Sequence, residues 1–363
     1  MSSSLAGRRI ALVGGAGFIG HNLALALRRK GGEVSVIDGL GVNNLLAFHD
    51  APQSKPNGKL YAQFIAQRIA LLQEAGIPLY VQDARDHRAL WDVLASVSPQ
   101  VIVHLAAVSH AGRSNKDPHT TFEHSLRTVE NALEWANKSA GHFIFFSSSM
   151  AYGNFRTAEV DEDHPLNPIG IYGALKVAGE KLVIAHSQVF GLPYTIIRPS
   201  ALYGPRCVSR RVGQIFIEDA LRGQPLRIEG DGAERLDFTF IEDLAEGVAL
   251  VIEKPEARNQ VFNMTYGSSR SIAELADIVT EHFPGVERQY VKRDKLMPFR
   301  GTLSIRKARE ILGYQPQNPI EVGLPKYIAW YREFFECPEA SRDQSLARLP
   351  QPPLVPLAVA GRN

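Results

Sequence analysis

The stretch that decides the fold is IALVGGAGFIG, residues 10–20. Its apolar run ends in glycines and is followed by a helical pattern, which is typical of a buried strand, a tight turn and a helix. In such a turn we expect Gly14 to permit the sharp bend, Gly17 to let the backbone approach a ligand, and Gly20 to let helix and strand pack closely. Free N–H groups and the helix dipole favour an anion at the start of that helix. The segment therefore predicts a dinucleotide-binding turn with a pyrophosphate at the helix N-terminus.

Outward from this turn, short apolar strands alternate with helical stretches. Strands are expected at Arg9–Val13, Glu33–Ile37, Leu79–Gln82, Val101–Leu105, His142–Ser147 and Tyr194–Arg198. Helices are expected at Ile19–Lys30, Ala89–Ser96, Thr120–Lys138 and Ile171–Phe190. Such alternation implies βαβ units and a parallel sheet covered on both faces. The sequence therefore predicts an α/β protein with a Rossmann-type, doubly wound parallel sheet.

Beyond residue 198 the pattern loosens into loops and shorter helices, which predicts a smaller C-terminal domain. We expect a dinucleotide-binding Rossmann domain over residues 1–198 and a mainly substrate-binding domain over residues 199–338. Residues 242–264 read as a helix and a strand that return to the first domain. Ser271 and Glu274 form a capping-box pattern at the start of another helix, Ser271–His282. Residues 339–363 are rich in proline and are interpreted as a tail, either disordered or laid over a neighbour.

Residues 39–78 form a longer excursion than a βαβ connection requires. Helical periodicity over Lys59–Glu74 predicts an extra helix on the surface. We interpret this helix as decoration, because insertions in surface loops are tolerated thermodynamically.

Composition narrows the classes of partner. The 363 residues include 40 lysines and arginines against 38 acidic residues, a formal net charge of +2. That balance argues against nucleic acid or an anionic membrane surface as the main partner. No apolar run reaches the length of about 18 residues that a membrane span requires. Two cysteines, Cys207 and Cys337, make neither a disulfide framework nor a zinc site, so we expect no metal and a cytoplasmic location.

Asp38 ends the second expected strand, where a carboxylate accepts hydrogen bonds from an adenosine ribose and repels a 2′-phosphate. No arginine directly follows it, because the next residues are Gly39-Leu40-Gly41. NAD is therefore favoured over NADP as the cofactor. Asp83 follows the third strand and is placed to touch the adenine, with capping of the next helix as its alternative role.

Tyr172 and Lys176 are spaced i and i+4 on an expected helix, so both point from one face. A tyrosine hydroxyl titrates near pH 10, and a neighbouring ammonium together with a positive nicotinamide ring would lower that pKa. The run Ser147-Ser148-Ser149 ends the strand that enters the same region. A hydroxyl there is suited to orient a reacting substrate oxygen towards the phenolate.

Taken together, these signatures resemble the extended short-chain dehydrogenase/reductase family, in particular its NAD-dependent epimerase/dehydratase branch, which includes UDP-glucose 4-epimerases. The matching segments are GGAGFIG (14–20), HLAA (104–107), SSSMAYG (147–153), YGALK (172–176), RPSALYGP (198–205) and DFTFIED (237–243). The resemblance implies that Ser148, Tyr172 and Lys176 are catalytic and that many relatives pair as homodimers through the helices at 120–138 and 171–190. With the turn residues, it gives the expected cofactor contacts Gly14, Gly17, Phe18, Ile19, Gly20, Asp38, Asp83, Ala84, Leu105, Ala106, Ala107, Tyr172, Lys176 and Ser200.

The resemblance also implies a reaction. Tyr172 takes a proton from a sugar hydroxyl while hydride leaves the same carbon for NAD, and hydride then returns to the other face of the bound keto sugar. In the family that this chain resembles, dehydratases have Thr-Asp-Glu starting at the catalytic hydroxyl, and decarboxylases have Thr-Ser-Glu. This chain has Ser148-Ser149-Met150 at the same place. The acid that dehydration requires is absent there, and the acidic residues at 159–163 read as a solvated loop. Epimerisation, most simply at C4 of a nucleotide sugar, or simple redox is favoured.

Two departures from the family pattern concern the substrate. Leu236 stands where nucleotide-sugar relatives usually have an arginine that contacts the diphosphate, and Ala201 stands where they have an asparagine. Arginines in the neighbouring loops offer compensation, since their guanidinium groups suit phosphate. The candidate substrate contacts are Ser149, Met150, Arg206, Arg211, Arg235 and Arg300. A sugar or sugar-acid dehydrogenase remains the rival enzyme, and a regulatory protein that senses NAD is the alternative outside enzymes.

Overall fold

The computed structural model describes residues 4–49, 57–108 and 111–336. A seven-stranded sheet forms its centre, in the order β12-β7-β5-β4-β1-β2-β3, and every neighbouring pair is parallel. The strands are β1 (Arg9–Val13), β2 (Glu33–Asp38), β3 (Leu79–Val81), β4 (Val101–His104), β5 (His142–Phe146), β7 (Tyr194–Arg198) and β12 (Gln260–Asn263). The fold class predicted from the sequence is confirmed. The chain reverses its direction of winding between β1 and β4, and the crevice at that point is where ligands bind in open α/β sheets.

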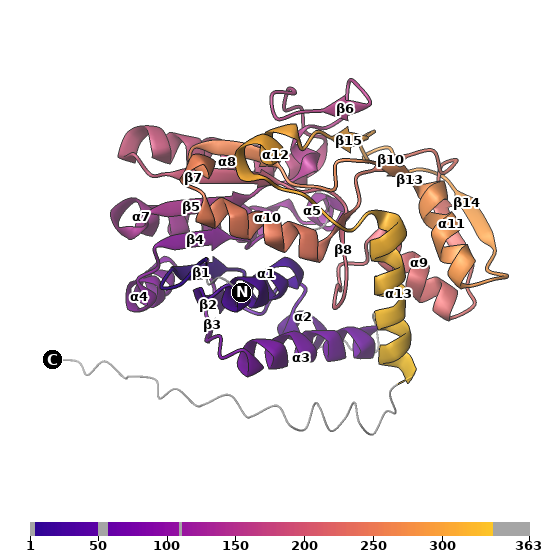
Figure 1. Ribbon diagram of the computed structural model, residues 1–363, viewed down its shortest axis with the longest axis horizontal. Coiled ribbons are helices and arrows are strands. Elements are labelled where there is room, and N and C mark those ends of the chain that lie inside the picture. Colours follow the sequence, from indigo (N-terminus) through magenta and orange to yellow (C-terminus); the bar gives the residue numbers. More distant parts are fainter. Residues whose placement is uncertain (1–3, 50–56, 109–110, 337–363) are drawn as a thin grey trace.

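Helices cover both faces of the sheet (Figure 1). On β1, Ile10 and Leu12 face one core while Ala11 and Val13 face the other, as the alternation of a strand requires. The first core also takes in α1 (Phe18–Arg29) and α10 (Ile241–Glu253). The second takes in α4 (His87–Val97), α7 (Thr128–Ser139) and α8 (Gly170–Phe190). Within the described ranges, no helix combines the length and apolarity needed to cross a bilayer.

The helix expected over Thr120–Lys138 is interrupted. It begins as α6 (Pro118–Phe122), passes through a π-helical turn at Glu123–Arg127, and continues as α7. A short helix, α5 (Ala111–Lys116), precedes it. A π turn adds one residue to the helical repeat, so the residues before it present a different face from the one the regular spacing predicts.

The C-terminal part adds small paired strands and helices beside the main sheet. The pairs are β8 (Leu202–Tyr203) with β11 (Thr239–Phe240), β9 (Leu226–Glu229) with β14 (Arg288–Val291), β10 (Arg235–Leu236) with β13 (Arg270–Ser271), and β6 (Glu159–Val160) with β15 (Thr302–Leu303). The helices are α9 (Val212–Leu221), α11 (Ile272–His282), α12 (Arg306–Leu312) and α13 (Ile320–Glu336). The Ser271–Glu274 capping box is present at the start of α11. Short 3₁₀ turns lie at Ser149–Ala151 and Pro255–Ala257.

The expected division into domains remains a prediction, and the pairing of β12 with β7 supports the return of residues 242–264 to the first domain. The proline-rich segment 339–363 lies outside the described residues.

The excursion after Asp38 is more than decoration. It forms α2 (Leu45–His49) and α3 (Gly58–Glu74), and α3 lies along α1 and reaches α13 (Figure 1). The Phe64 side chain is fully buried, with its ring 4.8 Å from that of Trp330. The Tyr61 hydroxyl donates to the carboxylate of Glu218 on α9 at 2.8 Å. The prediction of a surface helix was therefore wrong in its placement: α3 joins the core between the two parts of the chain.

Candidate active site

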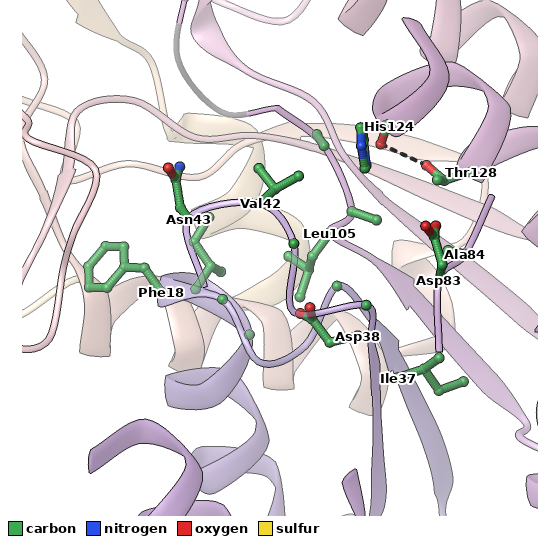
Figure 2. A pocket seen from close by; sticks show the side chains of 18 of the residues that line it. Phe18, Ile37, Asp38, Val42, Asn43, Asp83, Ala84, Leu105, His124 and Thr128 are labelled. Atoms are coloured by element: carbon green, nitrogen blue, oxygen red, sulfur yellow. Dashed lines mark hydrogen bonds between the residues drawn. The ribbon is translucent and has the colours of Figure 1, made fainter. Parts of the chain in front are cut away.

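A cavity opens at the carboxyl ends of β1, β2 and β4, at the point where the winding reverses (Figure 2). The expected cofactor contacts that line it are Gly14, Gly17, Phe18, Ile19, Gly20, Asp38, Asp83, Ala84, Leu105, Ala106 and Ala107. These residues come from four separate segments, and the fold brings them round one space. The lining also includes residues that the sequence did not single out, among them Arg68, Arg113, His124 and Thr128.

The three glycines of the turn meet three different surroundings. Gly14 has a φ of +81°, and a Cβ there would lie 2.5 Å from the backbone nitrogen of Ala106. A Cβ on Gly20 would lie 2.4 Å from the carbonyl oxygen of Gly15. A Cβ on Gly17 would meet only the carbonyl oxygen of Gly14, at the ordinary contact distance of 3.4 Å, and the residue lines the cavity at the start of α1. The turn thus offers an open backbone cradle at a helix N-terminus, which fits a pyrophosphate.

Asp38 and Asp83 both line the cavity but are held differently (Figure 2). The Asp38 carboxylate accepts backbone N–H groups from Ala16 at 3.0 Å and Leu40 at 2.8 Å, while burial raises its pKa. The Asp83 carboxylate pairs with Arg85, which lowers the pKa of Asp83. The next helix is capped by Asp86 and not by Asp83.

Ser148, Tyr172 and Lys176 come together on the other side of β4. The Lys176 ammonium lies 5.9 Å from the centre of the Tyr172 ring and donates to the carbonyl of Phe146 at 2.7 Å. Burial lowers the pKa of Lys176 to about 8. The spacing on α8 therefore delivers both side chains to one place, beside a serine that follows β5.

The pKa of Tyr172 departs from expectation. Burial raises it, and the two groups that oppose the rise are the Arg211 guanidinium and the Ser148 hydroxyl, which hydrogen-bonds to Tyr172. We expected a neighbouring ammonium to lower this pKa. In the structure the cation with that effect is Arg211, because the Lys176 ammonium is directed to the Phe146 carbonyl.

A buried network lies beneath this group. Glu180, one turn beyond Lys176 on α8, forms an ion pair with Arg198 at the end of β7 and accepts the hydroxyl of Ser147 at 2.5 Å. Arg198 also donates to the hydroxyl of Tyr152 at 2.9 Å. Glu180 was not among the residues expected from the sequence, although its i+4 spacing from Lys176 indicates that both lie on one face of the helix.

Arg211 and Arg300 have similar surroundings. The Nε atom of each is buried and has no hydrogen-bond partner among the described residues. Burial lowers the pKa of Arg300 to about 10, and repulsion from Arg211 adds to this. Two neighbouring cations with unpartnered donors are suited to bind an anion.

Two other predicted substrate contacts are directed elsewhere. The Arg206 guanidinium donates to His21 at 3.0 Å and to Asn22 at 3.4 Å, both on α1. The Arg235 guanidinium contacts Ser269 and Glu274. The assignment of both to the substrate stays a prediction, with Arg206 already bonded to helix α1 and Arg235 to Ser269 and Glu274.

The remaining candidates lie around Ser148. The hydroxyl of Ser149 donates to that of Ser200 at 3.2 Å, and both side chains are buried, as is Met150. Leu236 belongs to the hydrophobic core. Ala201 has a φ of +35°, a left-handed conformation in which asparagine is far more common than alanine. Neither the Leu236 nor the Ala201 side chain can donate a hydrogen bond to a phosphate.

A parallel doubly wound sheet, a glycine turn under its crevice and a Ser–Tyr–Lys group beside it define a Rossmann-fold protein of the extended short-chain dehydrogenase/reductase type. A family model described as "NAD dependent epimerase/dehydratase family" matches residues 10–265, and the chain belongs to this family.

Among similar proteins, an uncharacterized UDP-glucose epimerase of Bacillus subtilis is 30% identical over 240 residues, which cover 65% of this chain and 75% of that protein. The solved UDP-glucose 4-epimerase of Thermotoga maritima, with UDP-glucose, is 27% identical with a TM-score of 0.78, over 90% of this chain and 99% of the other. A dTDP-glucose 4,6-dehydratase of Streptomyces venezuelae, solved with NAD, is 26% identical with a TM-score of 0.76, over 90% and 97%. Epimerases and dehydratases are thus both among the relatives.

Proposed function

We propose that this protein is an NAD-dependent nucleotide-sugar epimerase that acts at C4. The observation that carries the proposal is the grouping of Ser148, Tyr172 and Lys176 next to a cradle for a dinucleotide, with no carboxylate in the two positions that follow Ser148. The similar Bacillus and Thermotoga proteins are named as UDP-glucose epimerases, which supports the proposal.

The residues of the cavity fit NAD. Gly17 leaves room for a pyrophosphate, and the Asp38 carboxylate is suited to accept ribose hydroxyls and to repel a 2′-phosphate. When bound, NAD supplies a hydride acceptor that also returns the hydride. Phe18, Ile19, Asp83, Ala84 and Leu105–Ala107 would enclose it, with Ser200 deeper in the site.

The protein's own groups manage the proton. Tyr172 takes it from the sugar hydroxyl at C4, and Ser148 orients that hydroxyl towards the phenol oxygen. Arg211 favours the phenolate, because positive charge nearby stabilises it, and Lys176 lies beside the Tyr172 ring with its ammonium 5.9 Å from the ring centre. After the keto sugar turns over in the pocket, Tyr172 returns the proton to the oxygen at C4.

Arg211 and Arg300 are assigned to the diphosphate of the substrate. Their Nε donors, which have no partner among the described residues, are available for hydrogen bonds to the phosphates, whereas the side chain of Leu236 cannot make them. Arg211 and Arg300 also repel each other. An anion placed between them relieves the repulsion and accepts charge-assisted hydrogen bonds. The substrate is therefore a nucleoside diphosphate sugar held by a pair of arginines from two different loops.

Dehydration is disfavoured by the same site. Met150, which cannot act as an acid, is buried where a dehydratase requires one. Glu162, from the acidic segment 159–163, is engaged within the protein, because it accepts the backbone N–H of Asn263 at 2.7 Å. The rival activity, net oxidation of a sugar or sugar acid, is favoured by the altered Leu236 and Ala201 positions.

The test is NMR of the purified protein with a panel of UDP-, GDP-, CDP- and dTDP-sugars and no added nicotinamide. A C4 epimer that forms with wild type and is lost in Tyr172→Phe is the expected result. Reduction of added NAD by free sugars or sugar acids, with no epimer formed, would replace the proposal with the dehydrogenase. The homodimer implied by the family remains a prediction, and light scattering measures it.

A further inference from the structure

Arg68 lies on α3, in the excursion that follows Asp38, and lines the cavity assigned to the cofactor. Its relative exposure is 0%, and it is the largest fully buried side chain among the described residues. Surface insertions do not normally bury an arginine, because removing its charge from water is costly unless a partner compensates. The partners of Arg68 therefore show what α3 is for.

Two of its three nitrogens are used within the protein. Nε donates to the backbone carbonyl of Arg206 at 3.1 Å, and Nη2 donates to the same oxygen at 2.5 Å. Nη1 is buried and has no hydrogen-bond partner among the described residues. Burial also lowers the pKa of Arg68 to about 10, a sign that its charge is not fully compensated.

The chemistry of the cavity identifies the missing partner as an anion. Asp38 lies in the same cavity (Figure 2). Its carboxylate oxygens accept the N–H groups of Ala16 and Leu40. Gly17 lines the cavity at the positive end of α1, where an anion is favoured. The negative charge of NAD resides on its pyrophosphate, since the adenosine ribose is neutral.

We propose that Arg68 binds the pyrophosphate of NAD through Nη1, so that the excursion after Asp38 is part of the cofactor site. This inference rests on the NAD binding assigned under the proposed function. The contact differs from the backbone cradle of the glycine turn, because it comes from a separate helix and carries a full charge.

The other end of the same side chain fixes a loop. Arg206 has a φ of +63°, and the residues that follow it include Val208, Ser209 and Arg211, all of which line the cavity. Arg68 thus holds this loop by one carbonyl through Nε and Nη2, and in the proposed contact Nη1 serves the pyrophosphate. Helix α3 is itself anchored to α9 through Tyr61 and Glu218.

The experiment is calorimetric titration of cofactor-stripped protein with NAD, ADP and adenosine. In Arg68→Met, which preserves the length of the buried chain but removes its charge, NAD and ADP are expected to bind about 10- to 100-fold more weakly. Adenosine, which has no phosphate, is expected to bind as it does to wild type. Tyr61→Phe is the matched control: it removes the bond to Glu218 from the same helix and leaves NAD affinity within about twofold.

Three results would overturn the inference. The first is unchanged affinity for NAD and ADP in Arg68→Met. The second is an equal loss of affinity for ADP and adenosine, which would show that Arg68 only holds the loop. The third is a wild-type preference for NADP that Arg68→Met abolishes, which would show that Arg68 binds a 2′-phosphate. Wild type that binds neither NAD nor ADP would instead remove the cofactor from the proposed function. If Arg68→Met does not fold, Arg68→Lys takes its place. A single nitrogen cannot serve both the Arg206 carbonyl and a phosphate, so the affinity for ADP must fall at least about tenfold relative to the affinity for adenosine.

Discussion

The carboxylate of Glu180 and the guanidinium of Arg198 meet at two points, with Oε1 2.9 Å from Nε and Oε2 2.7 Å from Nη2. Both side chains are almost completely buried, at 2% and 5% exposure. The pair joins the helix that carries Tyr172 and Lys176 to the end of β7. Because Glu180 also raises the pKa of Lys176, one carboxylate both positions the catalytic helix and tunes its ammonium.

Glu180→Gln is expected to lower the pKa of Lys176 below its value of about 8. Lys176 then loses its charge at lower pH, so the alkaline limb of the kcat profile moves to lower pH. The unpaired Arg198 is expected to reduce the free energy of unfolding by about 3 kcal/mol. Ser147→Ala, which removes one hydrogen bond but no charge, is the control and leaves the alkaline limb in place. An unmoved limb in Glu180→Gln would refute this role.

Tyr172→Phe is expected to lower kcat for epimerisation by about 10²- to 10⁴-fold, because the group that accepts the proton is gone. NAD affinity should stay close to wild type, since the cofactor cavity is lined by other residues. Rate measurements by NMR and calorimetric titration test the two parts separately. Substantial epimerisation by this variant would mean that another base acts.

Arg211→Met and Arg300→Met form a matched pair. Each is expected to raise the KM for the nucleotide sugar by about 10- to 100-fold, through loss of a charge-assisted contact with the diphosphate. Only Arg211 lowers the pKa of Tyr172, so only Arg211→Met should move the acidic limb of kcat to higher pH. Identical pH profiles for the two variants would contradict this separation of roles.

His142 gives a prediction for acid stability. Burial lowers its pKa to about 4, while in the unfolded chain it titrates near 6.5. Between these values the unfolded state binds the additional proton, so stability falls as pH falls. His142→Gln removes this contribution. Between pH 6.5 and 5 the free energy of unfolding is expected to fall in both proteins, but by about 2 kcal/mol less in the variant than in wild type. Urea unfolding at both values measures the difference, and equal drops would exclude the effect.

Local pattern predicted most of the elements and left their partners open. The bounds of β1 and β7 match the expected strands, and Ser271 caps α11 as its spacing indicates. These features depend on periodicity and on neighbours within a few residues. The position of α3 does not: its apolar face and Arg68 find their partners in α13 and in the loop at Arg206, far away in the sequence.

The arginines show the same limit. From the sequence we expected Arg206, Arg211, Arg235 and Arg300 near the substrate, and the fold directs Arg206 to α1 and Arg235 to Ser269 and Glu274. The Nε atoms of Arg211 and Arg300 have no partner within the part of the chain that the structure describes. The sequence therefore indicates the position of an arginine backbone, but tertiary hydrogen bonds determine where its guanidinium group lies.

The place of β12 at the edge of the main sheet has a consequence for how the chain is made. Its partner β7 ends at residue 198, but β12 can pair with it only after residue 263 has been synthesised and has left the ribosome. Until then the edge of β7 has open hydrogen-bonding groups, which favour pairing with other chains. A gene fragment that stops after β7 would therefore yield an aggregation-prone product, and a useful truncation or fusion point must lie beyond β12.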